Sequence, residues 1–359
     1  MNRFLTIVGM CLIGMLSLSG LANIAHAAEY PLPPANSRLI GENSTYTVSD
    51  DNLPLEFIAA KYQIGLLAML EANPGVDPYL PKAGTELIIP SQMLLPDTPR
   101  QGIVINLAEL RLYYYPKGAN NVIVYPIGIG QLGRNTPTMT TSVSQLIKHP
   151  TWTPTANIRK DYASRGITLP AVVPAGPENP MGDFALRLAA GRGEYLIHGT
   201  NANFGIGMRV SSGCIRLRPD DIEELFRTVP KGTRVQIINE PVKYAVEPDG
   251  KRYVEVHQPL SKTESDDPQL MPIVRSTGLV EFIDNPATDE VIVDQAINRR
   301  SGMPVQVNKG QVPDNPKGVS VSKPIEAVPV ENSEEAISGI KPADVSSLHQ
   351  PEPIYQPGI

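Results

Sequence analysis

The sequence predicts a mainly β protein: a β-sandwich-like domain over 98–240, a small α+β unit before it, and a disordered C-terminal tail over 305–359. Residues 98–240 contain short runs rich in Val, Ile and Tyr, separated by polar or Gly- and Pro-containing turns, which is the pattern of strands. From 305 onward Pro, Gly, Ser, Glu, Lys and Asp dominate. Such a segment buries too little apolar surface to offset the entropy of ordering.

Residues 1–27 have the pattern of a signal peptide. Arg3 precedes an apolar stretch from Phe4 to about Leu21, and Ala25-His26-Ala27 places small side chains where signal peptidase cleaves. We therefore expect cleavage after Ala27 and export to the periplasm. A retained membrane anchor is the alternative, but the apolar run is short for a bilayer span. We expect no transmembrane anchor later in the chain.

The charge balance argues against nucleic acid as a partner. The chain carries 31 basic and 37 acidic side chains, a net charge of −6, and the loss of Arg3 with the signal peptide makes it −7. Phosphate binding needs a concentrated basic face, and a net acidic chain does not predict one.

Cys214 is the only cysteine expected in the mature protein, because Cys11 lies in the signal peptide. One thiol cannot form an internal disulfide. A structural zinc site would need about four clustered ligands, and the mature histidines are scattered at His149, His198, His257 and His349.

Residues 44–90 predict a strand–helix–helix–strand unit after a Pro-containing lead-in over 28–43. We expect a strand at 46–48, a helix opened by Asp50 to Asn52, a second helix that ends at 73–75, and a closing strand at 87–90.

The domain over 98–240 begins with a hairpin, 102–106 paired with 110–115. Pro126 in the next strand indicates a sheet edge or a bulge. The stretch 133–193, rich in Pro, Gly and Thr, predicts a long irregular loop, and such loops are usually functional. The elements expected after it are a strand over 195–197, a helix over 218–226 and a strand over 233–238.

A C-terminal subdomain is expected over 241–304. It contains a strand at 253–256 and a helix at 288–300, with acidic residues early, basic residues late and Gly302 just past its end as the expected cap.

His198 and Cys214 are the candidate catalytic pair. They lie sixteen positions apart and are joined by a loop-forming stretch over 199–207. A neighbouring imidazole can take the thiol proton, and the resulting ion pair would favour the thiolate, which is the nucleophile. Gly213 lets the backbone approach a substrate, so that N–H groups near Cys214 could face an oxyanion. Arg216 could hold a carboxylate.

A structural role is the alternative for this pair. Cys214 could be a small buried apolar residue and His198 a hydrogen-bonded core histidine. The flanking glycines favour catalysis. Export also favours it, because an unpaired thiol without a function is not expected in an oxidising compartment.

The unit over 44–90 resembles a LysM module, a peptidoglycan-binding fold. The resemblance rests on Tyr46-x-Val48, Phe57-Ile58-Ala59, Asn73-Pro74 and Leu87-Ile88-Ile89-Pro90. LysM repeats typically carry Gly-Asp-Thr-Leu where this chain has Asp50 to Leu53. The alternative is a small packing domain without a ligand.

The candidate pair also resembles a known signature. His198-Gly199-Thr200, the spacing to the thiol, and Ser211-Ser212-Gly213-Cys214-Ile215-Arg216-Leu217 are similar to YkuD-type L,D-transpeptidases, in particular the enterobacterial ErfK/YbiS group. The similarity covers about 30–308. Many members of this family carry histidine where this chain has Ser212.

The resemblance implies a reaction. The thiol attacks the L-centre carbonyl of diaminopimelate in a peptidoglycan tetrapeptide stem, D-alanine leaves, and an amine resolves the thioester. The acceptor is the lysine of a Braun-type lipoprotein, which is favoured, or another stem. Cys214 would be the nucleophile and His198 the general base. Gly213, Ser212, Ser211 and Gly199 would orient the site or bind the oxyanion, and Arg216, Thr200 and Asn201 would contact substrate.

No cofactor and no metal are implied, because the thioester stores the acyl energy. Two alternatives remain open at this point. One is a hydrolase on the same scaffold, in which water resolves the thioester. The other is a wall-binding protein without catalytic activity.

Overall fold

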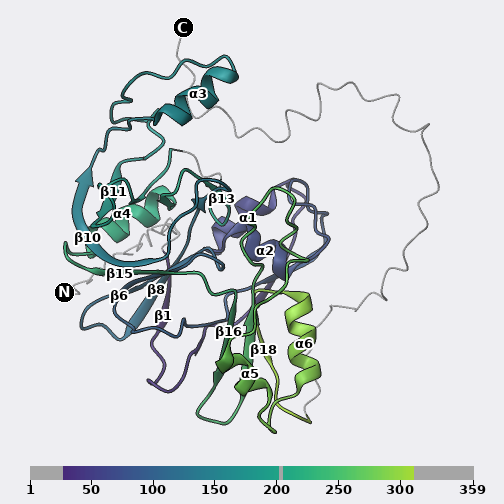
Figure 1. Cartoon of the computed structure of the whole chain (residues 1–359). Helices are drawn as coiled ribbons and strands as arrows, with labels where there is room; N and C mark the ends of the chain where they lie inside the picture. Colours follow the sequence, from purple (N-terminus) through teal and green to yellow (C-terminus); the bar gives the residue numbers. More distant parts are fainter. Residues whose placement is uncertain (1–26, 202–204, 311–359) are drawn as a thin grey trace, which may run out of the picture.

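The computed structural model describes residues 27–201 and 205–310. Figure 1 shows a large curled sheet, the strand–helix–helix–strand unit beside it and a smaller C-terminal unit next to both. The mainly β class is confirmed. Residues 1–26 of the expected signal peptide, with Cys11, lie outside the described residues, as does the expected tail from 311 onward, with His349.

One nine-stranded sheet forms the main body. Its strand order is β1-β8-β7-β6-β15-β10-β11-β12-β14, and β15 and β14 each run parallel to a neighbour while the other pairs are antiparallel. Its strands are β1 (Ala28–Pro31), β6 (Gly102–Asn106), β7 (Arg111–Tyr115), β8 (Asn121–Pro126), β10 (Met139–Lys148), β11 (Phe184–Leu188), β12 (Leu196–His198), β14 (Ile215–Arg216) and β15 (Arg234–Ile238).

Strand β10 makes the expected β-sandwich-like domain one continuous sheet that curls over on itself. Its first part, 139–142, pairs with β15, and its second part, 143–148, pairs with β11, with an irregularity in register between Val143 and Gln145. One long bent strand therefore joins two halves that curl over a common core.

The expected irregular loop over 133–193 is wrong, because this stretch contains β10, β11 and helix α3 (Ala156–Ser164).

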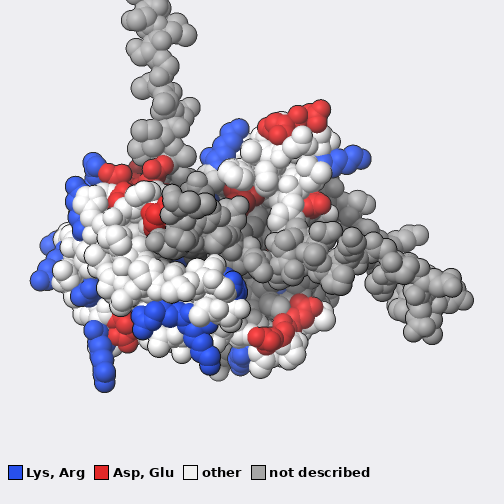
Figure 2. All heavy atoms as spheres, turned by 90° about the horizontal axis from the view of Figure 1, so that it is seen from above, with Lys and Arg blue, Asp and Glu red and all other residues white. Residues whose placement is uncertain are grey.

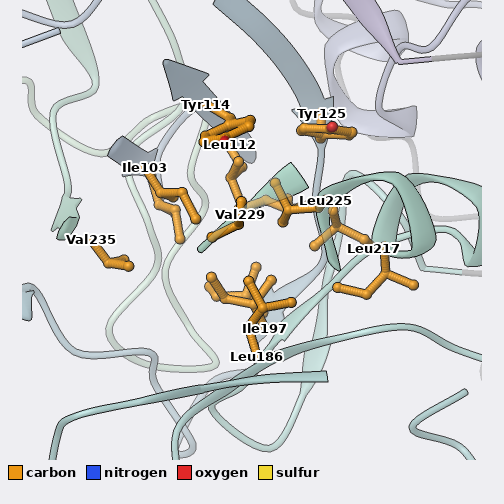
Figure 3. Packing of buried hydrophobic residues seen from close by; sticks show 14 of the residues in the cluster. Ile103, Leu112, Tyr114, Tyr125, Leu186, Ile197, Leu217, Leu225, Val229 and Val235 are labelled. Carbon is orange, nitrogen blue, oxygen red and sulfur yellow. The ribbon is translucent and has the colours of Figure 1, made fainter. Parts of the chain in front are cut away.

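The main core lies inside the curl. Helix α4 (Pro219–Thr228) contributes its apolar side there, and the Phe226 ring lies 4.8 Å from that of Phe184 on β11. Figure 3 shows side chains from the sheet and from α4 meeting in this core: Ile103, Leu112, Tyr114, Tyr125, Leu186, Ile197, Leu217, Leu225, Val229 and Val235. Burial of apolar surface on this scale supplies most of the free energy that stabilises the curled sheet.

The expected lead-in over 28–43 is wrong at its start, because β1 forms an edge strand of the sheet. It pairs with β8 only up to Val124. Pro126 therefore lies at the end of β8, where only β7 is its neighbour. A proline fits there because it has no N–H to donate to a second strand.

The strand–helix–helix–strand order over 44–90 is present. It consists of β3 (Ser44–Thr47), α1 (Leu55–Lys61), α2 (Leu66–Ala72) and β4 (Glu86–Ile89), and β3 pairs with β4 antiparallel. A second small pair, β2 (Leu39–Ile40) and β5 (Met93–Leu94), flanks it. The unit has its own apolar core, which includes Leu55, Ile58, Met69 and Leu87.

The C-terminal unit is an antiparallel sheet of β16 (Val242–Val246), β17 (Arg252–Val256) and β18 (Pro304–Gln306), with helices α5 (Thr277–Ile283) and α6 (Glu290–Arg299). The expected strand and the expected helix are both present. The start of the tail at 305 is wrong, because Val305 pairs with β17 and Val307 is fully buried. The helix cap is also corrected: Arg300, at φ 49°, is the left-handed C-cap of α6.

Helix α2 begins against the main body. The N–H groups of Leu66 and Leu67, which have no partner within a helix, donate to the carbonyls of Ile206 and Gly207 at 3.3 and 3.2 Å. Arg218 of the main body donates to Ile64 O at 2.9 Å. The small unit is therefore hydrogen-bonded to the loop between His198 and Cys214.

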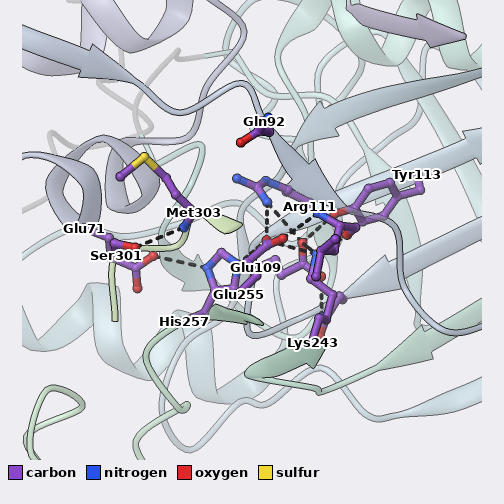
Figure 4. A network of polar contacts seen from close by, with 12 residues as sticks. Glu71, Gln92, Glu109, Arg111, Tyr113, Lys243, Glu255, His257, Ser301 and Met303 are labelled. Carbon is purple, nitrogen blue, oxygen red and sulfur yellow. Dashed lines mark hydrogen bonds and ion pairs between the residues drawn. The ribbon is translucent and has the colours of Figure 1, made fainter. Parts of the chain in front are cut away.

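A buried network of charges joins the three units, as Figure 4 shows. Its carboxylates are Glu71, Glu109 and Glu255, and its cations are Arg111, Lys243 and His257. Burial lowers the pKa of His257, but hydrogen bonds to Glu255 and Glu71 outweigh it and raise this pKa to about 9. Three negative and three positive groups therefore balance, as buried charges must.

Within the described ranges, no helix has both the length and the apolar character that a bilayer span requires. Basic and acidic side chains both occur on the face shown in Figure 2, where grey atoms cover part of the surface.

Candidate active site

Strands β12 and β14 bring the two candidate residues to one face of the sheet. The strands run parallel, with Ile197 opposite Ile215 and His198 opposite Arg216. Ile197, Ile215 and Leu217 point into the core. Because side chains alternate along a strand, His198, Cys214 and Arg216 lie on the other face. From a strand spacing of about 4.8 Å and a rise of about 3.3 Å per residue, the Cα atoms of His198 and Cys214 are about 8 Å apart.

The thiol of Cys214 is free and half-buried. Its S–H donates to Glu194 O at 3.5 Å. Burial raises the pKa of this thiol, and the N–H of Leu196 and the charge of Arg216 offset only part of that effect. The thiol is therefore protonated at neutral pH.

The His198 side chain is buried, 6% exposed, and its Nδ1 lies 2.6 Å from Gly199 O. A carbonyl oxygen only accepts, so Nδ1 carries the proton and Nε2 keeps a lone pair. Burial, and then the positive charge of Arg216, lower the pKa of His198 to about 4. The imidazole is therefore neutral and basic at Nε2.

These two directions of pKa shift correct the expected thiolate–imidazolium ion pair. With a protonated thiol and a neutral imidazole, the resting pair is uncharged, and no hydrogen bond joins the two side chains among the described contacts. The arrangement suits proton removal during attack on a substrate rather than a preformed thiolate.

The residues just before the thiol are held by short local bonds. Ser211 Oγ donates to Cys214 O at 2.6 Å and accepts from the N–H of Gly213 at 3.2 Å. Ser212 is exposed, and its Oγ accepts from Arg134 at 3.1 Å. Gly213 has φ +106°, a backbone conformation that glycine adopts without strain.

Helix α3 lies near Arg216. Burial lowers the pKa of Arg216, and electrostatic interactions with Tyr162 of α3 and with Cys214 offset only part of that effect. The Arg216 Nε has no hydrogen-bond partner among the described residues. A partly buried guanidinium with an unpaired N–H suits a carboxylate ligand. Tyr162 is a residue that the sequence did not single out, because only the fold places α3 over this face.

The remaining expected site residues lie around the end of β12. A β-carbon on Gly199 would lie 2.9 Å from Ile222 Cγ2, so the packing of α4 requires a glycine there. Thr200 is 3% exposed. Asn201 donates to Pro177 O at 3.0 Å. The contacts of Thr200 and Asn201 with substrate stay predictions.

Two residues next to the nucleophile segment, Thr136 and Arg134, were not predicted from the sequence. Thr136 donates to Gly213 O at 3.0 Å, and Arg134 donates to Ser212 Oγ. Both lie in a stretch rich in Pro, Gly and Thr, in which no pattern distinguishes one threonine from another.

One group of potential metal ligands occurs among the described residues: Glu109, Glu255 and His257, all buried. Lys243 Nζ lies 2.8 Å from Glu109 Oε2 and 3.0 Å from Glu255 Oε1. An ammonium therefore occupies the position between the carboxylates that a metal ion would take.

A cavity of about 510 Å³ lies at the start of the C-terminal unit, lined by residues that include Arg38, Glu240, Tyr244 and Ile273. None of its lining residues belongs to the site around Cys214, so it has no part in the chemistry of the thiol.

Comparison with known proteins gives two family matches. Residues 100–237 match the L,D-transpeptidase catalytic domain, and 241–307 match the L,D-transpeptidase C-terminal domain. Over 294 residues the chain is 62% identical to the probable L,D-transpeptidase YcfS of Escherichia coli K12, a match that spans 81% of this chain and 92% of the relative.

Two further relatives from Escherichia coli K12 are each 57% identical to this chain. The match to the probable L,D-transpeptidase YbiS covers 80% of this chain and 95% of the relative. The match to the probable L,D-transpeptidase ErfK/SrfK covers 79% of this chain and 92% of the relative.

Proposed function

Because this chain belongs to the L,D-transpeptidase family, we propose that Cys214 is the nucleophile of a cysteine acyltransferase acting on peptidoglycan tetrapeptide stems. The observation that carries this proposal is the hydrogen bond between His198 Nδ1 and Gly199 O. It supports a proton on Nδ1 and a lone pair on Nε2 that could take the thiol proton, on the strand beside Cys214 and on the same face of the sheet. A hydrogen bond to the backbone of Met181 also acts on this imidazole.

In the first half of the reaction, Sγ attacks the L-centre carbonyl of diaminopimelate while its proton passes to His198 Nε2. The tetrahedral intermediate collapses, the bond to D-alanine breaks, and the imidazolium returns the proton to the departing amine. A thioester on Cys214 remains. The low pKa of His198, about 4, supports the second of these proton transfers, because an imidazolium of such acidity gives up its proton readily. The same pKa makes the imidazole a weaker base for the first transfer.

In the second half, an acceptor amine attacks the thioester, His198 takes a proton from it, and the thiol leaves with a proton. We propose the lysine ε-amine of a Braun-type lipoprotein as the preferred acceptor and the side-chain amine of another stem as the second. This preference rests on the resemblance to the ErfK/YbiS group. Hydrolysis of the thioester by water remains the alternative outcome.

Arg216 supports recognition of a stem carboxylate. It lies two residues from the nucleophile on the same face, and its Nε is unpaired among the described residues. The loop residues Thr200 and Asn201 are proposed as further substrate contacts, and Gly213, Ser212, Ser211 and Gly199 as the groups that shape the oxyanion site.

We propose 44–90 as a wall-binding module, 98–240 as the catalytic domain and 241–310 as a C-terminal subdomain that includes β18 and the buried Val307. The remaining residues, 311–359, lie outside the described residues and are proposed as a tail. Tyr79 and Leu80, 68% and 57% exposed, supply the apolar surface that a sugar ring would contact. Removal of a signal peptide after Ala27 would place the protein in the periplasm, where peptidoglycan is its partner.

Product analysis separates the alternatives. The purified protein is incubated with a tetrapeptide muropeptide, with and without a peptide that ends in lysine. Transfer to the lysine peptide supports the transpeptidase with a lipoprotein-type acceptor, a stem dimer supports cross-linking, and free tripeptide alone supports the hydrolase. The matched variants are Cys214→Ala, which is expected to lose every product, and Thr141→Val, at a residue outside the proposed catalytic site that donates to Ala189 O, which is expected to retain them. Sacculus binding with none of these products would leave only the wall-binding alternative.

A further inference from the structure

Thr136 is buried, 7% exposed, beside the segment that carries the nucleophile. Its hydroxyl makes two hydrogen bonds: Oγ1 accepts from the N–H of Gly130 at 3.0 Å and donates to Gly213 O at 3.0 Å. A hydroxyl has one proton. Because the N–H of Gly130 can only donate, the proton of Thr136 is directed to the carbonyl of Gly213.

The turn that contains Thr136 lies along the nucleophile segment. Gly130 of β9 (Ile129–Gly130) is opposite Ser211 of β13 (Arg209–Ser211), and Gln131 N donates to Ser211 O at 2.9 Å. A β-carbon on Gly213 would be 3.6 Å from the carbonyl oxygens of Arg134 and Asn135. The turn therefore contacts the backbone just before the thiol.

A bond to Gly213 O also fixes the N–H of Cys214. The peptide unit is planar and trans, so its C=O and its N–H point in opposite directions. The N–H of Gly213 is bonded to Ser211 Oγ, whereas the N–H of Cys214 has no hydrogen-bond partner among the described residues. This N–H is the donor that an oxyanion formed by attack of Sγ could accept from.

We propose that Thr136 is a positioning residue for acyl transfer: through Gly213 O it holds the N–H of Cys214 toward the oxygen of the carbonyl under attack. The inference rests on the proposed role of Cys214. Without the hydroxyl, the peptide between Gly213 and Cys214 would lose the bond that sets its plane. The substrate would still bind, but the developing oxyanion would receive a weaker hydrogen bond.

The test is single-turnover acylation by a tetrapeptide muropeptide, followed by intact-protein mass spectrometry. Thr136→Val keeps the shape of the side chain and removes the hydroxyl, whereas Thr136→Ser keeps the hydroxyl. Removing an oxyanion donor itself lowers kcat by about 10²–10³-fold, so we expect Thr136→Val to slow acylation about 10- to 100-fold, with the concentration dependence on muropeptide little changed. Thr136→Ser should stay within about threefold of the unmodified protein.

A matched control and a second reaction separate this role from general packing. Thr141 also donates to a backbone carbonyl, Ala189 O at 2.9 Å, away from the thiol, and Thr141→Val should acylate normally. Alkylation of Cys214 by iodoacetamide passes through no oxyanion, so Thr136→Val should alkylate at the unmodified rate. Thr136→Ala, with its smaller side chain, provides the same comparison if the valine variant does not fold.

Normal acylation by Thr136→Val or Thr136→Ala would overturn the proposal, and so would an equal loss in Thr136→Ser. An equal slowing of alkylation would also overturn it, because the thiol itself would then be disturbed. Acylated product from Cys214→Ala would instead refute the proposed function, so the two failures are distinguishable.

Discussion

His198 and Arg216 lie opposite each other on the parallel strands β12 and β14, and the charge of Arg216 lowers the pKa of the imidazole beyond the effect of burial. One arginine thus has two consequences. Together with burial, which has the larger effect, it keeps the base neutral over the physiological pH range, and it offers a positive charge two residues from the thiol.

The first prediction concerns pH. Because protonated His198 cannot accept the thiol proton, kcat/KM for acylation should fall as the pH drops through about 4. In Arg216→Gln the cation is gone, so the pKa of His198 should rise and the acid limb should move toward the reference value of about 6.5. Arg216→Lys keeps a charge and should leave the limb near its original position.

The measurement is the rate of D-alanine release between pH 3 and 8, with folding checked by circular dichroism at each pH. An acid limb at about 6.5 in the unmodified protein, or one that Arg216→Gln does not move, would show that Arg216 does not control the base.

The second prediction concerns stability at high pH. The folded-state pKa of His257, about 9, lies above its unfolded value of about 6.5. The imidazolium therefore stabilises the fold fully below about pH 6.5, and this contribution is lost as the pH rises through about 9. Its size is roughly 3 kcal/mol at most.

Urea unfolding of the unmodified protein and of His257→Gln at pH 7 and pH 10 tests this prediction. The difference in unfolding free energy between the two proteins should be large at pH 7 and should shrink at pH 10. A difference in unfolding free energy that is independent of pH would mean that the charge on His257 does not stabilise the fold through Glu71 and Glu255.

The third prediction concerns the contact between α2 and the loop that precedes the nucleophile. A β-carbon on Gly207 would lie 2.3 Å from Leu66 N, at φ +79°. Gly207→Ala should lower stability by about 1–2 kcal/mol for backbone strain and by a further 1–3 kcal/mol or so for the clash. It should also slow acylation, because the loop leads to Cys214.

Gly84→Ala is the matched control, since Gly84 has φ +82° and nothing within 4 Å of an added β-carbon. Gly84→Ala should lose only the stability that backbone strain costs, and it should acylate at the normal rate. Equal melting temperatures for the two variants would argue against a tight contact at Gly207.

The fourth prediction concerns wall binding. Tyr79→Ala should weaken sedimentation of the protein with purified sacculi several-fold without changing its melting temperature, because Tyr79 is 68% exposed. Leu270→Ala, at a site 80% exposed in the C-terminal part, is the control and should bind normally. Undiminished binding of Tyr79→Ala to sacculi would contradict the proposed contact between Tyr79 and a sugar ring.

Local patterns predicted many of the elements well. The hairpin of β6 and β7, the helix α4 after the thiol and the strand that leads into His198 each depend on periodicity and turn residues within a short window. The candidate pair could be predicted because His198 and Cys214 are distinctive residue types at a short spacing, and its catalytic role stays a prediction.

Other features depend on partners far away in the sequence. Strand β10 is rich in Thr and Ser and resembles a loop until β15 and β11 flank it. The bond between Glu71 and His257 spans 186 positions, and that between Thr136 and Gly213 spans 77. The neutral resting state of the pair follows from burial and from Arg216, and a sequence does not show how deeply a side chain is buried.

The measurement that tests the central claim most directly is the mass of the protein after brief exposure to tetrapeptide muropeptide without an acceptor, followed by peptide mapping. The account predicts one stem-sized adduct, with loss of D-alanine, on the peptide that contains Cys214, and none in Cys214→Ala. An adduct on another residue, or release of D-alanine by Cys214→Ala, would contradict it.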